Sequence, residues 1–241
     1  MISTVGVVIP AHNEEELLPA CLDALGAAIE QVRLPVRVAV VLDDCHDGSW
    51  EVVATRSWAR ALELRARNVG VARAAGFGAL LKASGGVDPD RIWLASSDAD
   101  SRVPRDWLAV QLEYAELGFD AVLGTIRVED WSGRPPEVPA NFVARYQPGD
   151  DHPHVHGANL GLSGAAYLRA GGVPSLQLSE DHGLARGLAG RRICRTGRIP
   201  VTTSGRVDAR ARGGFASYLD ALAASDRPES PLSSRPAPRR R

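Results

Sequence analysis

The residues best suited to chemistry in this sequence are two aspartates, Asp98 and Asp100, in the stretch RIWLASSDADSRVP. Alternate residues of an extended chain point to one side, so both carboxylates could project together from a strand end. Such a pair can hold a hard divalent cation, Mg²⁺ or Mn²⁺, which also binds diphosphate oxygens. A solvated strand end, with Asp100 or Ser101 capping the next helix, explains the same residues. The pair alone does not decide between these interpretations.

A second acidic cluster, Asp43, Asp44 and Asp47, lies in the stretch LDDCHDGSW. Asp47 or Ser49 could cap the helix that we expect after it. Capping does not account for all three aspartates, because like charges at one strand end are destabilising unless a ligand or cation uses them. A carboxylate here could accept hydrogen bonds from a ribose or from a base N–H.

A third acidic pair, Glu180 and Asp181, stands in SEDHG before an apparent helix. The helix dipole favours a charged first turn, which would explain the pair without any catalytic role. The functional interpretation is a general base that takes the proton of a hydroxyl group.

Histidines and arginines form two further groups. His152, His154 and His156 alternate in HPHVHG and would share one face of an extended chain, where they could bind a transition metal. The loop context favours a polar surface or an acceptor contact instead, with His156 facing the site. In TSGRVDARARGG, Arg206 and Arg210 belong either to a solvated basic face or to a set of contacts with a diphosphate.

An alternation of strands and helices in the first half must position these residues. The apolar run TVGVVIP predicts a buried strand, and the stretch after it predicts a helix with Asn13 as the N-cap. The repeated order favours an α/β fold with a mostly parallel, Rossmann-like sheet, in which ligands gather beyond the carboxyl ends of the strands. The expected strands cover residues 4–10, 35–42, 61–66, 91–97 and 120–128, and the expected helices cover 11–32, 50–59, 68–83 and 104–118.

The second half is less regular. Residues 129–157 are rich in proline, glycine and charge, and they predict a long functional loop with a short helix around 140–145. Two short helical segments, a strand or hairpin at 191–203 and a last short helix are expected after it. We expect one domain at 1–224, made of a nucleotide-binding half at 1–128 and a smaller acceptor and catalytic half at 129–224, with a disordered tail at 225–241.

The composition argues against several classes of protein. The chain of 241 residues has a net charge of −1, so no overall field would draw it to nucleic acid. No apolar run approaches the roughly 20 residues of a membrane span, and we expect no signal peptide, although a peripheral membrane contact stays open. The three cysteines are scattered and odd in number, which favours the cytoplasm.

Six segments, taken in chain order, resemble the family 2 glycosyltransferases, which have the GT-A fold. Each segment is weak alone, but six of them in the order of the family are strong together. The resemblance covers about residues 3–220 and rests on VVIPAHNEEELLPACLDAL, VVLDDCHDGS, ARNVGVARAAG, SSDADS, GANLGLSGAAYLRAGGVP and SEDHGLARGLAG.

The resemblance implies a transferase that uses a nucleotide-diphosphate sugar, with UDP, GDP or TDP as the carrier, and an acceptor hydroxyl. Asp100 would be the principal metal ligand with Asp98 beside it, and Asp181 would be the catalytic base with Glu180 as its acidic neighbour. The nucleotide pocket would be lined by Pro10, Asn13, Glu14, Asp43, Asp44, Arg67 and Asp98. The sugar and acceptor site would be shaped by Gly157, Ala158 and Asn159.

The chemistry of the residues agrees with this resemblance. A sugar that leaves a nucleotide develops negative charge on the diphosphate, and a divalent cation beside Asp100 would stabilise that charge. Asp181 could take the proton of the acceptor hydroxyl during one in-line displacement, which would invert the anomeric centre.

Three departures from the family pattern affect these roles. Cys45 stands where the second acidic segment usually has glycine, so the contacts beyond Asp43 stay open. Related folds often supply a late histidine to the metal, yet no histidine follows His182. Arg206 or Arg210 could stand in electrostatically, or water could complete the shell. The family's Q-x-x-R-W segment is absent, which argues against a processive membrane synthase.

Other functions fit parts of the pattern. A sugar-1-phosphate nucleotidyltransferase shares a similar domain, but it starts with a glycine-rich G-x-G-T/S-R loop and uses a catalytic lysine. Here the first strand ends in IPAHNEE, and the sole lysine, Lys82, lies in an expected helix. A dinucleotide-dependent dehydrogenase is disfavoured because no G-x-G-x-x-G follows a strand. A sugar-nucleotide-binding protein of degenerate transferase fold is the non-enzymatic alternative, against which the four aspartates count: Asp43, Asp98, Asp100 and Asp181.

Overall fold

The structure of the protein is a computed structural model that describes residues 1–176, 179–207 and 214–224. The expected tail at 225–241 and Arg210 lie outside the described residues. The strands are β1 Thr4–Ala11, β2 Val36–Asp43, β3 Ala59–Leu64, β4 Ile92–Ser96, β5 Ser101–Arg102, β6 Ala121–Val128, β7 Leu160–Ser163 and β8 Ile193–Thr203. The helices are α1 Leu18–Ile29, α2 Ser49–Ala54, α3 Val69–Ala83, α4 Trp107–Glu116, α5 Glu137–Arg145, α6 Gly164–Arg169, α7 Glu180–Gly187 and α8 Phe215–Ala224, with the 3₁₀ turns η1 Pro89–Arg91 and η2 Gly157–Asn159.

The strands form one sheet in the order β3-β2-β1-β4-β7-β6-β8-β5. Strands β3, β2, β1 and β4 are parallel, as the alternation of strands and helices predicts. Strand β7 runs antiparallel to both of its neighbours, and β5 runs antiparallel to β8. The second half of the chain therefore completes the sheet begun by the first half, and the mostly parallel α/β fold is confirmed.

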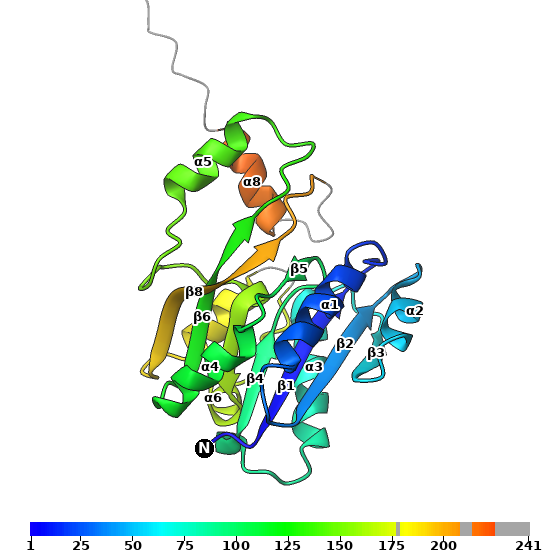
Figure 1. The fold of residues 1–241 in the computed structure, drawn as a ribbon, viewed down its shortest axis with the longest axis vertical. Helices are drawn as coiled ribbons and strands as arrows, with labels where there is room; N and C mark the ends of the chain where they lie inside the picture. Colours follow the sequence, from blue (N-terminus) through cyan, green and yellow to red (C-terminus); the bar gives the residue numbers. More distant parts are fainter. Residues whose placement is uncertain (177–178, 208–213, 225–241) are drawn as a thin grey trace, which may run out of the picture.

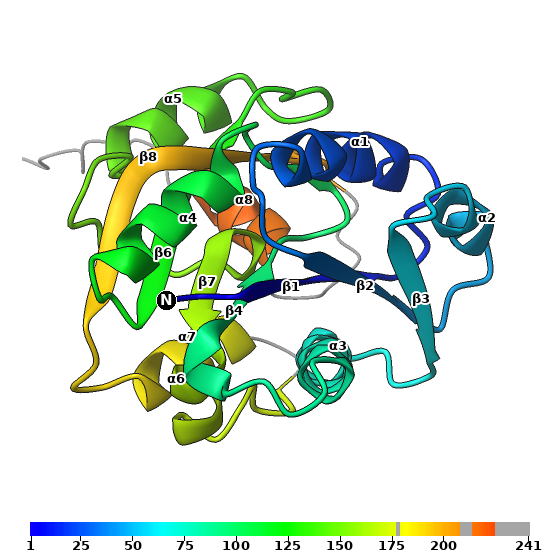
Figure 2. The same ribbon diagram turned by 60° about the horizontal axis from the view of Figure 1, so that its bottom comes forward.

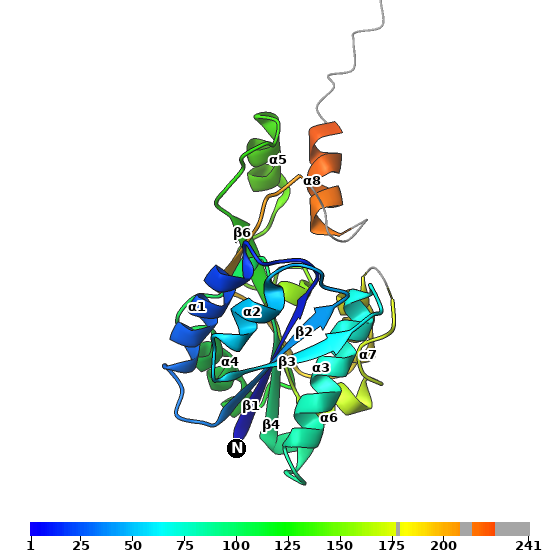
Figure 3. The ribbon, with the colours of Figure 1, turned by 90° about the vertical axis from the view of Figure 1, so that its right-hand side faces the viewer.

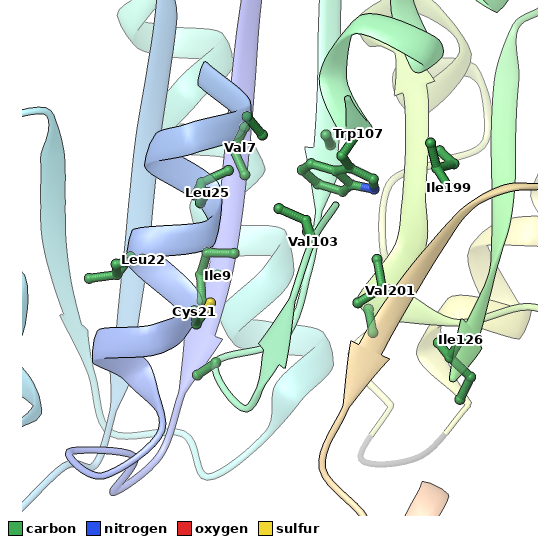
Figure 4. Close-up of a cluster of buried hydrophobic side chains, with 14 of the residues drawn as sticks. Val7, Ile9, Cys21, Leu22, Leu25, Val103, Trp107, Ile126, Ile199 and Val201 are labelled. Carbon is green, nitrogen blue, oxygen red and sulfur yellow. The ribbon is translucent and has the colours of Figure 1, made fainter. Parts of the chain in front are cut away.

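Helices cover both faces of this sheet. Figure 2 shows α1 and α4 on one face, and α3, α6 and α7 on the other. Strand β1 is buried along its whole length, because its alternate side chains enter two different cores. Val7 and Ile9 pack with Leu22 and Leu25 of α1, as Figure 4 shows, whereas Val8 packs toward α3.

Helix α3 approaches the sheet closely because it presents small residues to it. A Cβ on Gly76 would lie 2.6 Å from a methyl carbon of Val8 and 3.0 Å from one of Val41, so only glycine fits this contact. The side chain of Asn68 caps the helix by accepting a hydrogen bond from the Val71 N–H. The helix expected over residues 68–83 is thus confirmed as α3.

Two expectations about the helix after β1 are wrong. It begins at Leu18 and not beside Asn13, and its N-cap residue, Leu17, makes no side-chain cap. Asn13 instead adopts a left-handed conformation, with φ of 52°, and accepts a hydrogen bond from the His46 N–H at 2.8 Å. The residue that resembles a helix cap thus ties together the loops after β1 and β2.

Helices α5 and α8 project beyond the carboxyl ends of β6 and β8, as Figures 1 and 3 show. The short helix expected around residues 140–145 is α5. Phe142 of α5 meets Phe215 of α8 with ring centroids 6.0 Å apart, and Arg134 forms an ion pair with Asp220. No helix within the described residues has the length and apolar character that a membrane span requires.

Candidate active site

The candidate site lies where the loops after β1, β2 and β4 meet α7 and the segment after β8. These loops carry most of the acidic residues that the sequence singles out. Carboxyl ends of neighbouring parallel strands lie at one edge of a sheet, so chain segments far apart in sequence converge here.

Asp43 holds the loop that leads into α3. Its carboxylate accepts backbone N–H hydrogen bonds from Ala66, Arg67 and Asn68 at 2.6, 2.9 and 2.8 Å. The side chain is buried, so these donors replace the water that the charge would otherwise need. In this structure Asp43 therefore orders the loop between β3 and α3, and its predicted contact with a base or ribose stays a prediction.

Asp44, next to it, faces outward. Its carboxylate lies 3.3 Å from His46 Nε2 and 3.5 Å from Arg67 Nε. Asp44 and His46 line a hollow of about 590 Å³, which Trp50 and Arg65 also border. The hollow is large enough for a nucleobase, and Asp44 rather than Asp43 faces it.

Asp98 and Asp100 do not occupy an extended strand. Strand β4 ends at Ser96, and a turn closed by the Ser101 N–H and the Asp98 carbonyl, 3.1 Å apart, contains both aspartates. The expectation of two carboxylates on one side of an extended chain is therefore wrong. Each carboxylate meets a different arginine: Asp98 meets Arg73, and Asp100 meets Arg206.

Arg73 of α3 is the centre of a buried polar cluster. Its Nη2 donates to Asp98 Oδ1 at 2.6 Å, its Nε donates to Ser96 Oγ at 2.8 Å, and its Nη1 donates to Glu180 Oε1. Burial raises the pKa of Glu180, and the adjacent guanidinium opposes that rise. Glu180 is thus bound to Arg73, which leaves Asp181 as the outward-facing member of the acidic pair.

Arg206 forms a second, more open cluster. Its guanidinium donates to both carboxylate oxygens of Glu14, at 2.8 and 2.5 Å, and lies 3.0 Å from Asp100 Oδ2. Burial raises the pKa of Asp100 to about 6, with the negative charge of Asp98 adding to the rise and Arg206 opposing it. Of the two arginines predicted near a diphosphate, Arg206 therefore lies beside the predicted metal ligand.

Asp181 is held by backbone donors. Its Oδ2 accepts from the Gly157 N–H at 2.9 Å, and its Oδ1 accepts from the His182 N–H at 2.7 Å. Gly157 begins η2, so the base-like carboxylate is tied to the segment predicted to shape the acceptor site. The structure thus brings Asp181, Gly157 and Asp98 into one region around Arg73.

The three histidines form a stack with Tyr146. Ring centroids of His152 and His154 are 5.6 Å apart, those of His154 and His156 are 5.7 Å apart, and Tyr146 stacks on His154 at 4.0 Å. The Tyr146 hydroxyl lies 2.9 Å from His156 Nε2, and burial lowers the pKa of His156 to about 3. Among the described residues no three His, Cys, Asp or Glu side chains group as a metal ion would require. Each histidine Nε2 contacts a group of the protein: the Leu123 carbonyl for His152, the Gln147 N–H for His154 and the Tyr146 hydroxyl for His156.

Asn159 and Ala158 are enclosed by the protein. Asn159 Oδ1 accepts from Trp107 Nε1 at 2.9 Å, and its Nδ2 donates to the carbonyls of Thr125 and Ile199, both at 2.7 Å. Ala158 is buried as well. These contacts make Asn159 a link between α4, β6 and β8. Asn159 would therefore affect the sugar site by fixing the position of the turn η2.

Pro10 and Glu14 lie at the exit of β1. Pro10 is buried within the strand, and Glu14 is also buried, with its N–H donating to Ser49 Oγ at 3.0 Å. Arg67 is largely exposed, consistent with a side chain that could reach a ligand.

The main residue absent from the sequence predictions is Arg73. Its signal is a single arginine in the small-residue helix VGVARAAGFGALLKA. A charged residue that a helical period places toward the sheet must find buried partners. The resemblance to the family points instead to Arg67, just before this helix.

Comparison with known proteins agrees with this architecture. Residues 6–165 match the family model described as Glycosyl transferase family 2. S. aureus TarS in complex with UDP-GlcNAc superposes with a TM-score of 0.64 at 15% identity, over 92% of this chain and 66% of that one. The Pyrobaculum calidifontis mannosyltransferase in complex with GDP-Man and Mn²⁺ gives a TM-score of 0.57 at 23% identity, over 89% and 59% of the two chains.

Curated relatives match about half of the chain. The undecaprenyl-phosphate 4-deoxy-4-formamido-L-arabinose transferase of Aeromonas hydrophila is 33% identical over 127 residues, which is 52% of this chain and 37% of the relative. The enzyme of the same name from Pectobacterium carotovorum is 34% identical over 132 residues, with the same coverage. This chain thus spans well under half the length of these relatives. The match to the family model, together with the shared fold, shows that the chain belongs to glycosyl transferase family 2 and has the GT-A fold.

Proposed function

We propose that the protein transfers a sugar from a nucleotide-diphosphate donor to an acceptor, with inversion and with the aid of a divalent cation. The observation that supports this most is the convergence of Asp98, Asp100 and Asp181 at the carboxyl edge of the sheet, joined by two arginines. One side of this cluster offers carboxylates and an arginine for a cation and diphosphate. The other offers a carboxylate held by backbone N–H groups for an acceptor.

The carboxylates fit a hard cation only when a ligand shares it. Mg²⁺ and Mn²⁺ are commonly held by one or two carboxylates together with substrate phosphates and water. Asp100 is partly buried and has a raised pKa, so a nearby positive charge would favour its ionised form, and Asp98 lies beside it. When bound there with a donor, the cation would offset the negative charge of the departing diphosphate.

The chain's own residues supply the remaining steps. Arg206, held between Glu14 and Asp100, can turn its fork of donors toward diphosphate oxygens. Asp181 would take the acceptor proton, because Glu180 is already bound to Arg73. The Gly157 and His182 N–H groups would hold the two Asp181 oxygens in place, and each oxygen keeps a lone pair that can take the acceptor proton.

The structural neighbours support a nucleotide sugar as the donor. TarS has been solved with UDP and with UDP-GlcNAc, and the mannosyltransferase with GDP-Man and Mn²⁺. The hollow beside Asp44 and Trp50 would receive the base. All three cysteines are free thiols, which fits the reducing cytoplasm in which we place the protein.

A phosphate acceptor is a second candidate, favoured by the names of the curated relatives, which are undecaprenyl-phosphate sugar transferases. A phosphate is already ionised near neutral pH and needs little help from a base. Replacing Asp181 by asparagine should therefore cost much less activity with a polyprenyl phosphate than with a hydroxyl acceptor.

Binding and transfer assays test the proposal. Isothermal titration with UDP-, GDP- and TDP-sugars should show one nucleotide that binds at least tenfold more tightly with Mn²⁺ than with a chelator. Incubation with hydroxyl and polyprenyl-phosphate acceptors should then yield an inverted product, seen by NMR. Binding of none of the nucleotides would favour a degenerate protein. Formation of a nucleoside triphosphate together with sugar 1-phosphate, on addition of pyrophosphate, would favour a nucleotidyltransferase.

A further inference from the structure

Arg73 joins the two sides of the candidate site. Its side chain is only 2% exposed, and its donors reach Ser96 at the end of β4, Asp98 in the following turn and Glu180 in α7. These partners lie on separate segments that approach one another only in the folded chain. One buried guanidinium thus bonds to the side where a donor would bind and to the helix that carries Asp181.

The link to Asp181 has a second part, through Gly157. A Cβ at residue 157 would lie 2.6 Å from both Nη atoms of Arg73, so the guanidinium lies directly against this glycine. The Gly157 N–H in turn donates to Asp181 Oδ2 at 2.9 Å. Arg73 therefore restrains Asp181 twice, by bonding to the adjacent Glu180 and by packing against the residue that holds the carboxylate.

Helix α7 begins without a side-chain cap at its N-cap residue. Ser179, its N-cap residue, is left-handed with φ of 57° and makes no side-chain cap. A helix start without a cap is held by tertiary contacts, and the bond from Arg73 to Glu180 is one within its first turn.

We propose that Arg73 is a positioning residue that fixes Asp181 relative to Asp98, so that the general base and the donor-binding carboxylate behave as one rigid unit. Its planar fork is suited to this task, because it presents donors in several directions at once. Lysine keeps the charge but cannot bridge Ser96, Asp98 and Glu180 together. The proposal rests on the proposed function for its catalytic consequence but not for the mechanical link itself.

The mechanical link can be tested on the ligand-free protein. In Arg73→Lys, hydrogen exchange of the Gly157 amide and of the first turn of α7 should accelerate at least tenfold, while β1 keeps its protection. Arg56→Lys is the matched control, because Arg56 is also paired to an aspartate, Asp23, at 2.5 Å, but in another part of the chain. Unchanged exchange at Gly157 in Arg73→Lys would overturn the link.

Activity tests the functional consequence. Arg73→Lys should lower kcat about 10²-fold, the loss expected from a misplacement near 1 Å, with a smaller change in the binding of UDP or GDP with Mn²⁺. Glu180→Gln should lower kcat by a similar mechanism. In the double variant, the fold-loss of kcat should be far smaller than the product of the two single fold-losses. Losses that multiply, or a kcat unchanged in both variants, would overturn the positioning role.

The two tests separate this inference from the proposed function. If the wild type transfers no sugar from any donor, the proposed function fails, while the exchange result still decides the link. If Arg73→Lys does not fold, Glu180→Gln takes its place in the exchange test. Glu180→Gln retains an oxygen that can accept from Arg73, so this variant should fold. Hydrogen exchange of its α7 amides should accelerate, but less than if the bond to Arg73 were lost entirely.

Discussion

The candidate site contains two arginine–carboxylate clusters that differ in their surroundings. In the Arg73 cluster, formed with Asp98 and Glu180, the arginine side chain is 2% exposed. In the Arg206 cluster, formed with Glu14 and Asp100, it is 24% exposed and belongs to the segment after β8. A buried guanidinium that leaves its partners leaves buried charges unpaired, at a large desolvation cost. A partly exposed guanidinium can be hydrated while it changes partners. The first cluster is therefore suited to hold geometry and the second to exchange a protein partner for a ligand.

The difference also gives the two aspartates distinct roles. Asp98 is bound to a fixed cation supplied by the protein itself. Burial raises the pKa of both carboxyl groups, to about 6 for Asp100, but Asp100 shares its arginine with Glu14 in the more exposed cluster. A ligand can displace the partly exposed Arg206 from Asp100 more readily than the buried Arg73 from Asp98, which agrees with Asp100 as the principal metal ligand.

The largest expected effect concerns Asp181, which the Arg73 cluster positions. Asp181→Asn should lower kcat with a hydroxyl acceptor about 10³-fold, because the amide cannot take the proton. Titration should show unchanged binding of the nucleotide with Mn²⁺. Asp90→Asn, which disrupts an exposed pair with Arg169, serves as the control and should stay near wild type. Near-normal turnover in Asp181→Asn would contradict the assignment of the base.

The next largest expected effect concerns Asp100 in the Arg206 cluster. Asp100→Asn should lower Mn²⁺-stimulated transfer about 10²-fold, since it removes a charged ligand of the cation. A transfer assay with and without a chelator measures it, with Asp23→Asn as the control. Full stimulation by Mn²⁺ in Asp100→Asn would show that the cation binds elsewhere.

The pH dependence of stability tests the charge of Asp100 in the Arg206 cluster. A carboxyl group whose native pKa is raised above its unfolded value stabilises the fold when protonated, and this contribution is lost as the pH rises through about 6. In the presence of a chelator, the free energy of unfolding of Asp100→Asn should thus be about 2 kcal/mol higher than that of the wild type at pH 7.5. Near pH 4 the two proteins should be equal. Chemical denaturation across this pH range checks the trend, and a less stable variant at pH 7.5 would contradict it.

The smallest expected effect tests whether Arg206 exchanges its carboxylate partners for a ligand. Arg206→Gln should bind Mn²⁺ alone severalfold more tightly, because Asp100 loses a competing positive charge, yet bind UDP or GDP about tenfold more weakly. Electron paramagnetic resonance of free Mn²⁺ and calorimetry measure the two affinities. Arg102→Gln, at an exposed pair with Glu129, is the control. Loss of Mn²⁺ affinity in Arg206→Gln would mean that the two clusters do not differ as described.

Local patterns predict the elements of the first half well. The apolar run of β1, the small residues of α3 and the alternation of strands and helices lead to the observed parallel strands. They succeed because burial on both faces, close packing and capping leave local marks in the sequence. Asn13 is an exception, since its cap-like position is used to join two loops.

The partners of the polar residues were less predictable. Asp43 resembles a ligand contact but accepts three backbone N–H groups, and Asn159 resembles a site residue but bonds within the core. Both side chains are chemically able to do either task. Only the positions of groups brought in by other segments decide which one they perform.

The sequence by itself determined the family, the α/β alternation and the aspartates that converge at the sheet edge, because these depend on residue types and on order along the chain. The tertiary structure decided how the charges are paired. Arg73 on α3 meets Asp98 and Glu180, and Arg206 after β8 meets Glu14 and Asp100. Electrostatic partnership depends on distance and burial in three dimensions, and contacts between segments this far apart in the chain leave no local pattern.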